Sequence, residues 1–188
     1  GDLGNVTALK QLVSDSDVVF HCAAKITGFS PADFTDINVR GTERLVAAVA
    51  DQGCRRFVHL SSIAVYLGAE PVDGRFSETM ALDDRKVLDP YGRSKLLTEN
   101  AVVKGFQGAT TDYVILRPTF VYGPHIRSWT LLPLKLLLKK RGLFIGVDAG
   151  EGLLDAVYVE DVVQSMLAAA EVREAGRQVF NIGHERIT

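Results

Sequence analysis

Four short apolar runs separated by helical patterns constrain the fold of this chain more than any other feature. They cover residues 18–22, 57–61, 113–117 and 179–182. The run at 57–61 is apolar apart from His59, which is typical of a strand buried on both faces of a parallel sheet. Apolar residues recur at helical spacing at 5–14 and 36–51, and Gly53 suits the end of the second helix. The pattern therefore predicts an α/β fold built on parallel strands.

The composition fits one globular unit without a polyanionic partner. The 188 residues carry a formal net charge of −2, which gives no reason to expect nucleic acid or an anionic membrane surface as a partner. The most apolar stretch, 131–138, is too short to span a bilayer and contains Pro133 and Lys135. We expect a helix packed on the protein there, followed by basic residues at 139–141, and no membrane association.

Cysteine and histidine usage predicts neither a disulfide nor a metal site. Cys22 and Cys54 are the only cysteines, and two reduced thiols in a cytoplasmic protein are the expected state. The histidines lack the spacing of metal ligands; they are His21, His59, His125 and His184. We therefore expect no metal.

A tyrosine and a lysine one helical turn apart form the candidate catalytic pair. Pro90 suits the first turn of a helix, and helical spacing then places Tyr91 and Lys95 on one face. A neighbouring ammonium should lower the pKa of a phenol and make it a usable proton acceptor. Ser62, at the end of the strand near 57–61, could hold a substrate oxygen beside Tyr91. Ser61 is the rival for that role.

Motifs along nearly the whole chain resemble the extended short-chain dehydrogenase/reductase family, in particular its epimerase/dehydratase group. The matching segments are 1–3, 17–24, 38–42, 61–62, 91–95, 116–124, 158–162 and 180–183. The resemblance implies a Rossmann-like doubly wound parallel sheet. It also implies a partial NAD(P)-binding domain at 1–123 and a partial substrate-binding region at 124–188, with 155–183 returning to the sheet.

The glycine-rich turn that receives the cofactor pyrophosphate in this fold has no counterpart here. In the family it lies upstream of Asp2 and Leu3. We therefore expect an incomplete fold, with the first two strands absent and only part of the C-terminal substrate region present. Residues 18–20 should then form a strand with an unpaired apolar edge.

The resemblance also implies which residues meet the ligands. Candidate contacts to NAD or NADP are Asp2, Leu3, Cys22, Ala23, Ala24, Lys25, Asn38, Ser61, Tyr91, Lys95, Pro118 and Thr119. Candidate substrate contacts are Ser62, Phe120, His125 and Arg127. The helices at 36–51 and 90–105 are candidates for a homodimer interface.

The implied reaction is hydride transfer at a secondary alcohol or ketone carbon of a small molecule. Tyr91 is the acid/base, Lys95 supports it and Ser62 orients the substrate oxygen. Nucleotide-sugar relatives often carry an arginine immediately before the residue matching Asp155, whereas this chain has Leu153 and Leu154. That difference favours an apolar, hydroxysteroid-like substrate. The alternatives are a nucleotide-sugar 4-epimerase, a non-catalytic NAD(P)-binding protein, and an inert fragment.

Overall fold

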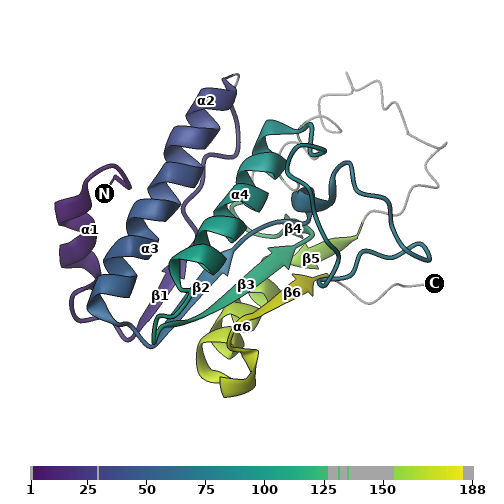
Figure 1. The fold of residues 1–188 in the computed structure, drawn as a ribbon. Helices are drawn as coiled ribbons and strands as arrows, with labels where there is room; N and C mark the ends of the chain where they lie inside the picture. Colours follow the sequence, from purple (N-terminus) through teal and green to yellow (C-terminus); the bar gives the residue numbers. More distant parts are fainter. Residues whose placement is uncertain (1, 29, 127–130, 132–134, 136–154, 184–188) are drawn as a thin grey trace.

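The computed structural model describes residues 2–28, 30–126, 131, 135 and 155–183 (Figure 1). The predicted helix at 131–138, the basic residues after it, and Leu153 and Leu154 lie outside these residues, except for positions 131 and 135. Within the described part of the chain, no helix is long and apolar enough to cross a bilayer.

A parallel sheet forms the centre of the molecule. Its strands are β1 (Val18–His21), β2 (Arg56–Leu60), β3 (Asp112–Pro118) and β6 (Gln178–Ile182), in the spatial order β1-β2-β3-β6. All three strand pairings are parallel, with Phe57 opposite Tyr113 and Val114 opposite Gln178. Because β6 pairs with β3, the last described segment returns to this sheet.

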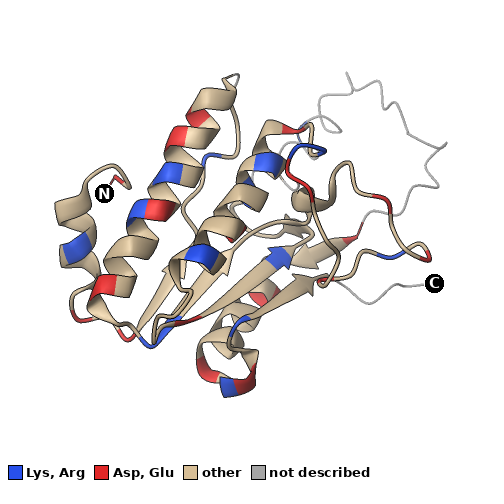
Figure 2. Cartoon of the chain, in the orientation of Figure 1, with Lys and Arg blue, Asp and Glu red and all other residues tan. Residues whose placement is uncertain are grey.

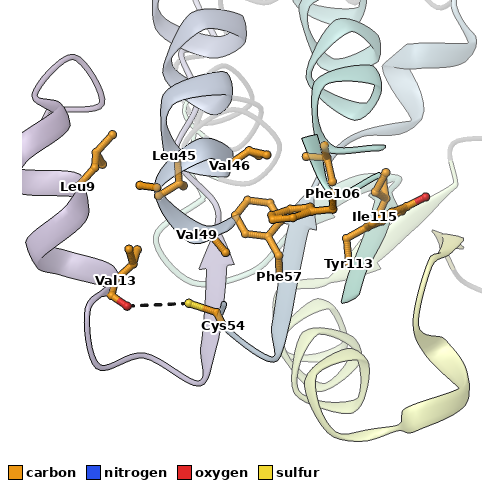
Figure 3. Packing of buried hydrophobic residues seen from close by; sticks show 12 residues of the cluster. Leu9, Val13, Leu45, Val46, Val49, Cys54, Phe57, Phe106, Tyr113 and Ile115 are labelled. Atoms are coloured by element: carbon orange, nitrogen blue, oxygen red, sulfur yellow. Dashed lines mark hydrogen bonds between the residues drawn. The ribbon is translucent and has the colours of Figure 1, made fainter. Parts of the chain in front are cut away.

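Helices cover both faces of the sheet, because successive strand side chains point to opposite sides. Phe57 and Ile115 pack in one cluster with helices α1 (Val6–Val13), α3 (Arg40–Gln52) and α4 (Pro90–Gly105), as Figure 3 shows. The next residues along the same strands form a second cluster with helix α6 (Val159–Glu171) on the opposite face. The predicted doubly wound α/β architecture is therefore confirmed.

Strand β1 lies at one edge of the described sheet, and its other side is unpaired among the described residues. Phe20 on this strand keeps 41% of its surface exposed. The prediction of an apolar strand edge at 18–20 is confirmed.

The helix predicted at 36–51 begins earlier in the structure. It comprises α2 (Pro31–Phe34), a π-helical segment (Thr35–Val39) and α3 in direct succession. Pro31 occupies the first turn, where its missing N–H costs no hydrogen bond. The π-helical segment shifts the helical register, so Asn38 faces inward while Ile37 is 44% exposed.

The chain leaves the main sheet after Pro118. The Thr119 N–H still donates to the carbonyl oxygen of Ile182, at 2.9 Å, and then β4 (Phe120–Tyr122) pairs with β5 (Ala156–Tyr158) in a second, two-stranded parallel sheet. The chain thus changes sheets at Pro118, a residue that lacks the N–H a sheet ladder needs.

Charged residues of both signs occur along α3 and α4 in Figure 2, whereas Lys10 is the one charged residue of α1. Exposed ion pairs include Lys10–Asp51 and Arg40–Asp36, with N–O distances of 3.2 and 2.7 Å. A homodimer interface through the helices at 36–51 and 90–105 stays a prediction.

Candidate active site

The predicted catalytic residues lie where β2 ends and α4 begins. Asp89 caps α4, because its Oδ2 accepts a hydrogen bond from the Gly92 N–H at 2.6 Å, and Pro90 occupies the first turn. Tyr91 and Lys95 therefore lie on successive turns beside the end of β2. Parallel sheets commonly bind ligands at this edge, where the carboxyl ends of the strands meet.

A glycine allows the close contact between α4 and the turn that follows β2. That turn is a 3-10 helix, Ile63–Tyr66, and the Ser62 hydroxyl caps it by accepting a hydrogen bond from the Ala64 N–H at 3.1 Å. A Cβ on Gly92 would lie only 2.4 Å from the carbonyl oxygen of Ala64. Glycine at position 92 is thus what lets Tyr91 approach Ser62.

Tyr91 is half-buried, and its phenol interacts with the Ser62 side chain. Burial raises the pKa of Tyr91 above 10.0 and the Asp89 carboxylate adds to this, while the interaction with Ser62 lowers it in part. The prediction that Lys95 lowers this pKa is therefore wrong for this structure, because burial dominates. The interaction does agree with the preference for Ser62 over Ser61.

Lys95 is buried, with 3% of its surface exposed, and its Nζ donates to the carbonyl oxygen of Leu60 at 2.5 Å. Burial lowers its pKa from 10.5 to about 8, against the opposing influence of Glu99 and Cys22. Near pH 7 the pair is therefore an ammonium and a neutral phenol.

Two neutral histidines lie near Lys95. The rings of His21 and His59 are 5.2 Å apart, and Thr42 and Thr98 contact their Nε2 atoms at 2.8 and 3.0 Å. Burial and then the charge of Lys95 lower the pKa of His21 to about 4, and the same causes lower that of His59. Both rings are therefore uncharged near neutral pH, so they add no second cation next to Lys95.

Three of the predicted cofactor contacts surround one hollow. Asp2, Leu3 and Ala23 line a hollow of about 420 Å³, together with Asp36, Ile37 and Arg44 of the long helix. Sequence reasoning did not single out the helix residues as lining. Ala24 and Lys25 are half-buried just beyond Ala23, and Cys22 is exposed.

Asn38 is buried, and its side chain forms hydrogen bonds within the protein. Only 1% of its surface is exposed, and its Oδ1 accepts from the Lys25 N–H at 2.7 Å. Its Nδ2 donates to the carbonyl oxygen of Lys25 and to the Ser94 hydroxyl, at 3.0 and 2.9 Å. The side chain thus ties the segment after β1 to helix α4. We assign it a positioning role instead of the predicted cofactor contact.

Ser61 also turns away from the predicted ligand position. It is 3% exposed and its hydroxyl donates to Glu99 Oε1 at 2.5 Å. Adjacent strand residues point to opposite sides, which explains why Ser61 and Ser62 have different partners.

The predicted ligand contacts at and after the end of β3 differ in how deeply they are buried. Pro118 is buried, while Thr119 and Phe120 are half-buried at the end of the strand. The Thr119 hydroxyl is buried and has no hydrogen-bond partner among the described residues. His125 is exposed on a turn with a φ of 67°, and Arg127 lies outside the described residues.

No group of three possible metal ligands occurs in the described part of the chain.

Sequence reasoning missed a buried ion pair next to this site. Glu99 and Arg117, with 4% of the surface of each exposed, form two hydrogen bonds of 2.9 and 2.7 Å. Two signals could have revealed it. Glu99 follows Lys95 by one helical turn on the buried face, and Arg117 ends an otherwise apolar strand, where a charge requires a partner.

Comparison with known proteins places the chain in a family. The sequence model of the NAD dependent epimerase/dehydratase family matches residues 1–183. A 4-hydroxy-2-methyl-3-oxo-4-farnesyl-3,4-dihydroquinoline-1-oxide ketoreductase from Stigmatella aurantiaca is 32% identical over 96% of this chain and 52% of its own length. UDP-glucose 4-epimerase from Vibrio cholerae is 27% identical over 98% of this chain and 58% of its own length.

Solved structures agree with these sequence matches. UDP-glucuronic acid 4-epimerase from Bacillus cereus, in complex with UDP-glucuronic acid and NAD, superposes with a TM-score of 0.83 at 30% identity. The match covers 99% of this chain and 59% of that one. The chain thus spans about half the length of the curated relatives it matches. Because the family model matches residues 1–183, the chain belongs to the NAD-dependent epimerase/dehydratase family of extended short-chain dehydrogenases/reductases.

Proposed function

We propose that the full-length protein is an NAD(P)-dependent oxidoreductase that transfers hydride at a secondary alcohol or ketone carbon. The observation that carries this proposal is the convergence of three side chains at the end of β2. The Ser62 side chain interacts with the phenol of Tyr91, and Lys95, whose ammonium donates to the Leu60 carbonyl oxygen, follows Tyr91 by one turn of helix α4. These are the groups that a proton transfer to or from a substrate oxygen requires.

The protonation states of Tyr91 and Lys95 at pH 7 suit the reduction of a carbonyl group. Tyr91 is a neutral phenol at pH 7, so it can donate its proton to the carbonyl oxygen as the oxygen gains negative charge. Ser62 orients that oxygen, and the positive charge of Lys95 stabilises the phenolate that remains. In the oxidative direction Tyr91 takes the proton back from the alcohol. Positioned acid–base help of this kind typically contributes about 10²- to 10⁴-fold to the rate.

Residues at the ends of β1 and β3 fit a dinucleotide. The nicotinamide supplies or accepts the hydride when the cofactor is bound. Asp2, Leu3 and Ala23 would hold the cofactor at their shared hollow, and Cys22, Ala24 and Lys25 would continue this side. Pro118 and Thr119 would meet it at the end of β3, where the Thr119 hydroxyl has no hydrogen-bond partner among the described residues. Either NAD or NADP is compatible with these residues.

We propose an apolar ketone or a hydroxysteroid-like alcohol as substrate, with Phe120 as part of its wall. A similar protein, the ketoreductase from Stigmatella aurantiaca, is named for a farnesylated substrate, which supports an apolar ligand. His125 and Arg127 remain predicted substrate contacts. The apolar pair Leu153 and Leu154, where nucleotide-sugar relatives often have an arginine, supports the same preference.

A nucleotide-sugar 4-epimerase is the second candidate. The similar structure from Bacillus cereus was solved with UDP-glucuronic acid, and the same three side chains would serve a transient oxidation at a sugar carbon. Supplying the full-length protein with apolar ketones and a reduced nicotinamide, and separately with UDP-sugars and NAD, distinguishes the two candidates. Net cofactor oxidation with a ketone identifies a reductase, and interconversion of two UDP-sugars without net cofactor change identifies an epimerase.

The proposed chemistry is tested by Tyr91→Phe in the full-length protein. We expect turnover to fall by at least about 10²-fold with nearly unchanged cofactor affinity, because only the phenolic proton is removed. Calorimetry measures the affinity and cofactor absorbance measures the turnover. Tyr113→Phe is the matched control, since Tyr113 packs in the core near the start of β3. Full activity of Tyr91→Phe would refute the proposal, whereas loss of turnover in both variants would point to a general packing effect.

A further inference from the structure

A continuous chain of buried polar contacts begins at the ion pair of Glu99 and Arg117. Arg117 Nε and Nη2 donate to the two carboxylate oxygens of Glu99, and the Ser61 hydroxyl donates to the same carboxylate. The pair joins helix α4 to the carboxyl ends of β2 and β3. It lies one helical turn beyond Lys95.

Tyr66 extends this chain to strand β6. Arg117 Nη1 donates to the Tyr66 hydroxyl at 2.6 Å, and the guanidinium carbon lies 5.0 Å from the centre of the tyrosine ring. The Tyr66 hydroxyl in turn donates to Asn181 Oδ1 at 2.8 Å. The ends of β2, β3 and β6 are therefore connected through side chains as well as through the sheet.

Asn181 forms hydrogen bonds with part of the long loop between Tyr66 and Asp89. Its backbone N–H donates to Glu78 Oε1 at 2.9 Å, and its Nδ2 donates to the carbonyl oxygen of Phe76 at 3.1 Å. The Phe76 ring also stacks on Tyr66, with centroids 5.0 Å apart. Residues 76–78 are thus docked across the end of β6, while the preceding tip of the loop, at Asp73 and Gly74, is exposed.

We propose that Tyr66 and Asn181 are positioning residues that hold segment 76–78 as a fixed wall on the substrate side of the site. The ion pair of Glu99 and Arg117 connects this wall to the helix that carries Tyr91 and Lys95. This inference rests on the proposed function. Most cofactor contacts proposed above lie around β1, at the opposite edge of the sheet, although Pro118 and Thr119 adjoin β6. Loosening the wall should therefore weaken substrate binding more than cofactor binding.

The first test is Tyr66→Phe in the full-length protein, which keeps the ring stack and removes the three hydrogen-bond contacts of the hydroxyl, with Arg117, Asn181 and the carbonyl oxygen of Ser77. Arg75 is exposed and directly precedes Phe76, so trypsin cleavage after Arg75 reports whether segment 76–78 is docked. We expect cleavage there to become several-fold faster, with cleavage after Lys86 unchanged. The KM for substrate should rise about tenfold, the equivalent of about 1.4 kcal/mol. The kcat and the cofactor Kd should stay close to wild type.

A second pair of variants keeps the test decisive if Tyr66→Phe does not fold. Glu78→Ala removes the acceptor for the Asn181 N–H and should reproduce both effects, while Glu78→Gln retains an acceptor oxygen and should restore most of the wild-type behaviour. Glu70→Ala is the matched control, since Glu70 is an exposed carboxylate on the same loop. It should leave both readouts unchanged.

Three results would overturn the inference. The first is cleavage after Arg75 at the wild-type rate in both Tyr66→Phe and Glu78→Ala. The second is faster cleavage with an unchanged KM, which would leave segment 76–78 without a role toward substrate. The third is a change in cofactor Kd as large as the change in KM. Cleavage is measured without substrate, so an active Tyr91→Phe would remove the proposed function and leave the docking of segment 76–78 separately tested.

Discussion

The structure buries two cations near the ends of β3 and β2, and they differ in their hydrogen-bond partners: Arg117 has a carboxylate and Lys95 has a backbone carbonyl oxygen. Arg117 and Lys95 are 4% and 3% exposed. Burial acts to lower the pKa of Arg117, but the hydrogen bonds and charge of Glu99, with a contribution from Tyr66, outweigh it and the pKa is raised. For Lys95 burial dominates, and its pKa falls to about 8.

The difference separates a stabilising group from a reactive one. Arg117 is held by a two-pronged carboxylate contact of the kind that fixes geometry. Lys95 donates to a neutral carbonyl oxygen and carries its charge at a cost in stability. Strongly perturbed lysines beside a crevice are candidates for function. We therefore assign a structural role to the Glu99–Arg117 pair and propose a catalytic role for Lys95.

Breaking the ion pair should produce the largest loss of stability. Glu99→Ala leaves the Arg117 guanidinium buried without its carboxylate, so we expect the free energy of unfolding to fall by about 3–5 kcal/mol. Denaturant unfolding of the full-length protein measures the change. The double variant Glu99→Ala/Arg117→Leu should recover much of the loss, because it removes the stranded charge. A loss below 1 kcal/mol in the single variant would show that the pair is not structural.

Acid should destabilise the region around Lys95 through the buried histidines. Burial holds the pKa of His21 at about 4, while the unfolded chain titrates near 6.5. Between these values the unfolded state binds more protons, so stability falls as the pH drops from 6.5 to 4, by roughly 3 kcal/mol for this residue. The pH dependence of the unfolding free energy tests this, and His21→Gln should have a shallower slope. An identical slope in the variant would rule out His21 as the titrating group.

Replacing Lys95 should increase the free energy of unfolding and remove activity, in contrast to the loss of stability expected for Glu99→Ala. Its pKa is lowered from 10.5 to about 8, so Lys95→Met should raise the unfolding free energy at pH 7 by up to about 3 kcal/mol. Wild-type stability should rise between pH 8 and 10.5, where the unfolded state binds more protons, and this rise should be absent in the variant. A variant that is less stable at pH 7 would contradict the burial cost assigned to the ammonium.

An ion pair at the surface, between helix α4 and the loop before it, should show the smallest effect on stability. Arg93 and Asp84 are 3.0 Å apart, and 52% and 29% of their side-chain surfaces are exposed. Arg93→Ala should change the unfolding free energy by less than about 1 kcal/mol, because exposed pairs gain little over their hydrated ions. The same denaturation series gives the value. A cost similar to that of Glu99→Ala would mean that burial does not distinguish the two pairs.

The sequence predicted the elements well because their signals are local. The run at 57–61 and the proline-started helix at 90–105 carry their patterns within a few residues, and the structure confirms both. The start of the helix at Pro31 was missed because the π-helical segment breaks the regular spacing.

Side-chain roles were harder to predict because they depend on partners distant in the sequence. Asn38 bonds to Ser94 and Tyr66 bonds to Asn181, and no spacing rule links such pairs. The expected effect of Lys95 on Tyr91 considered only the neighbouring charge and ignored burial, which reverses the direction of the pKa shift. Periodicity can place a residue on a face, but only the packed structure fixes its surroundings.

The most direct test of the central claim is a double-mutant cycle on Tyr91 and Lys95. Activity is measured as kcat/KM in the full-length protein for Tyr91→Phe, Lys95→Met and the double variant. If the phenol and the ammonium work as one proton-transfer unit, the double variant should lose no more activity than the worse single variant. Losses that multiply would show that the two residues act independently, and they would contradict the account.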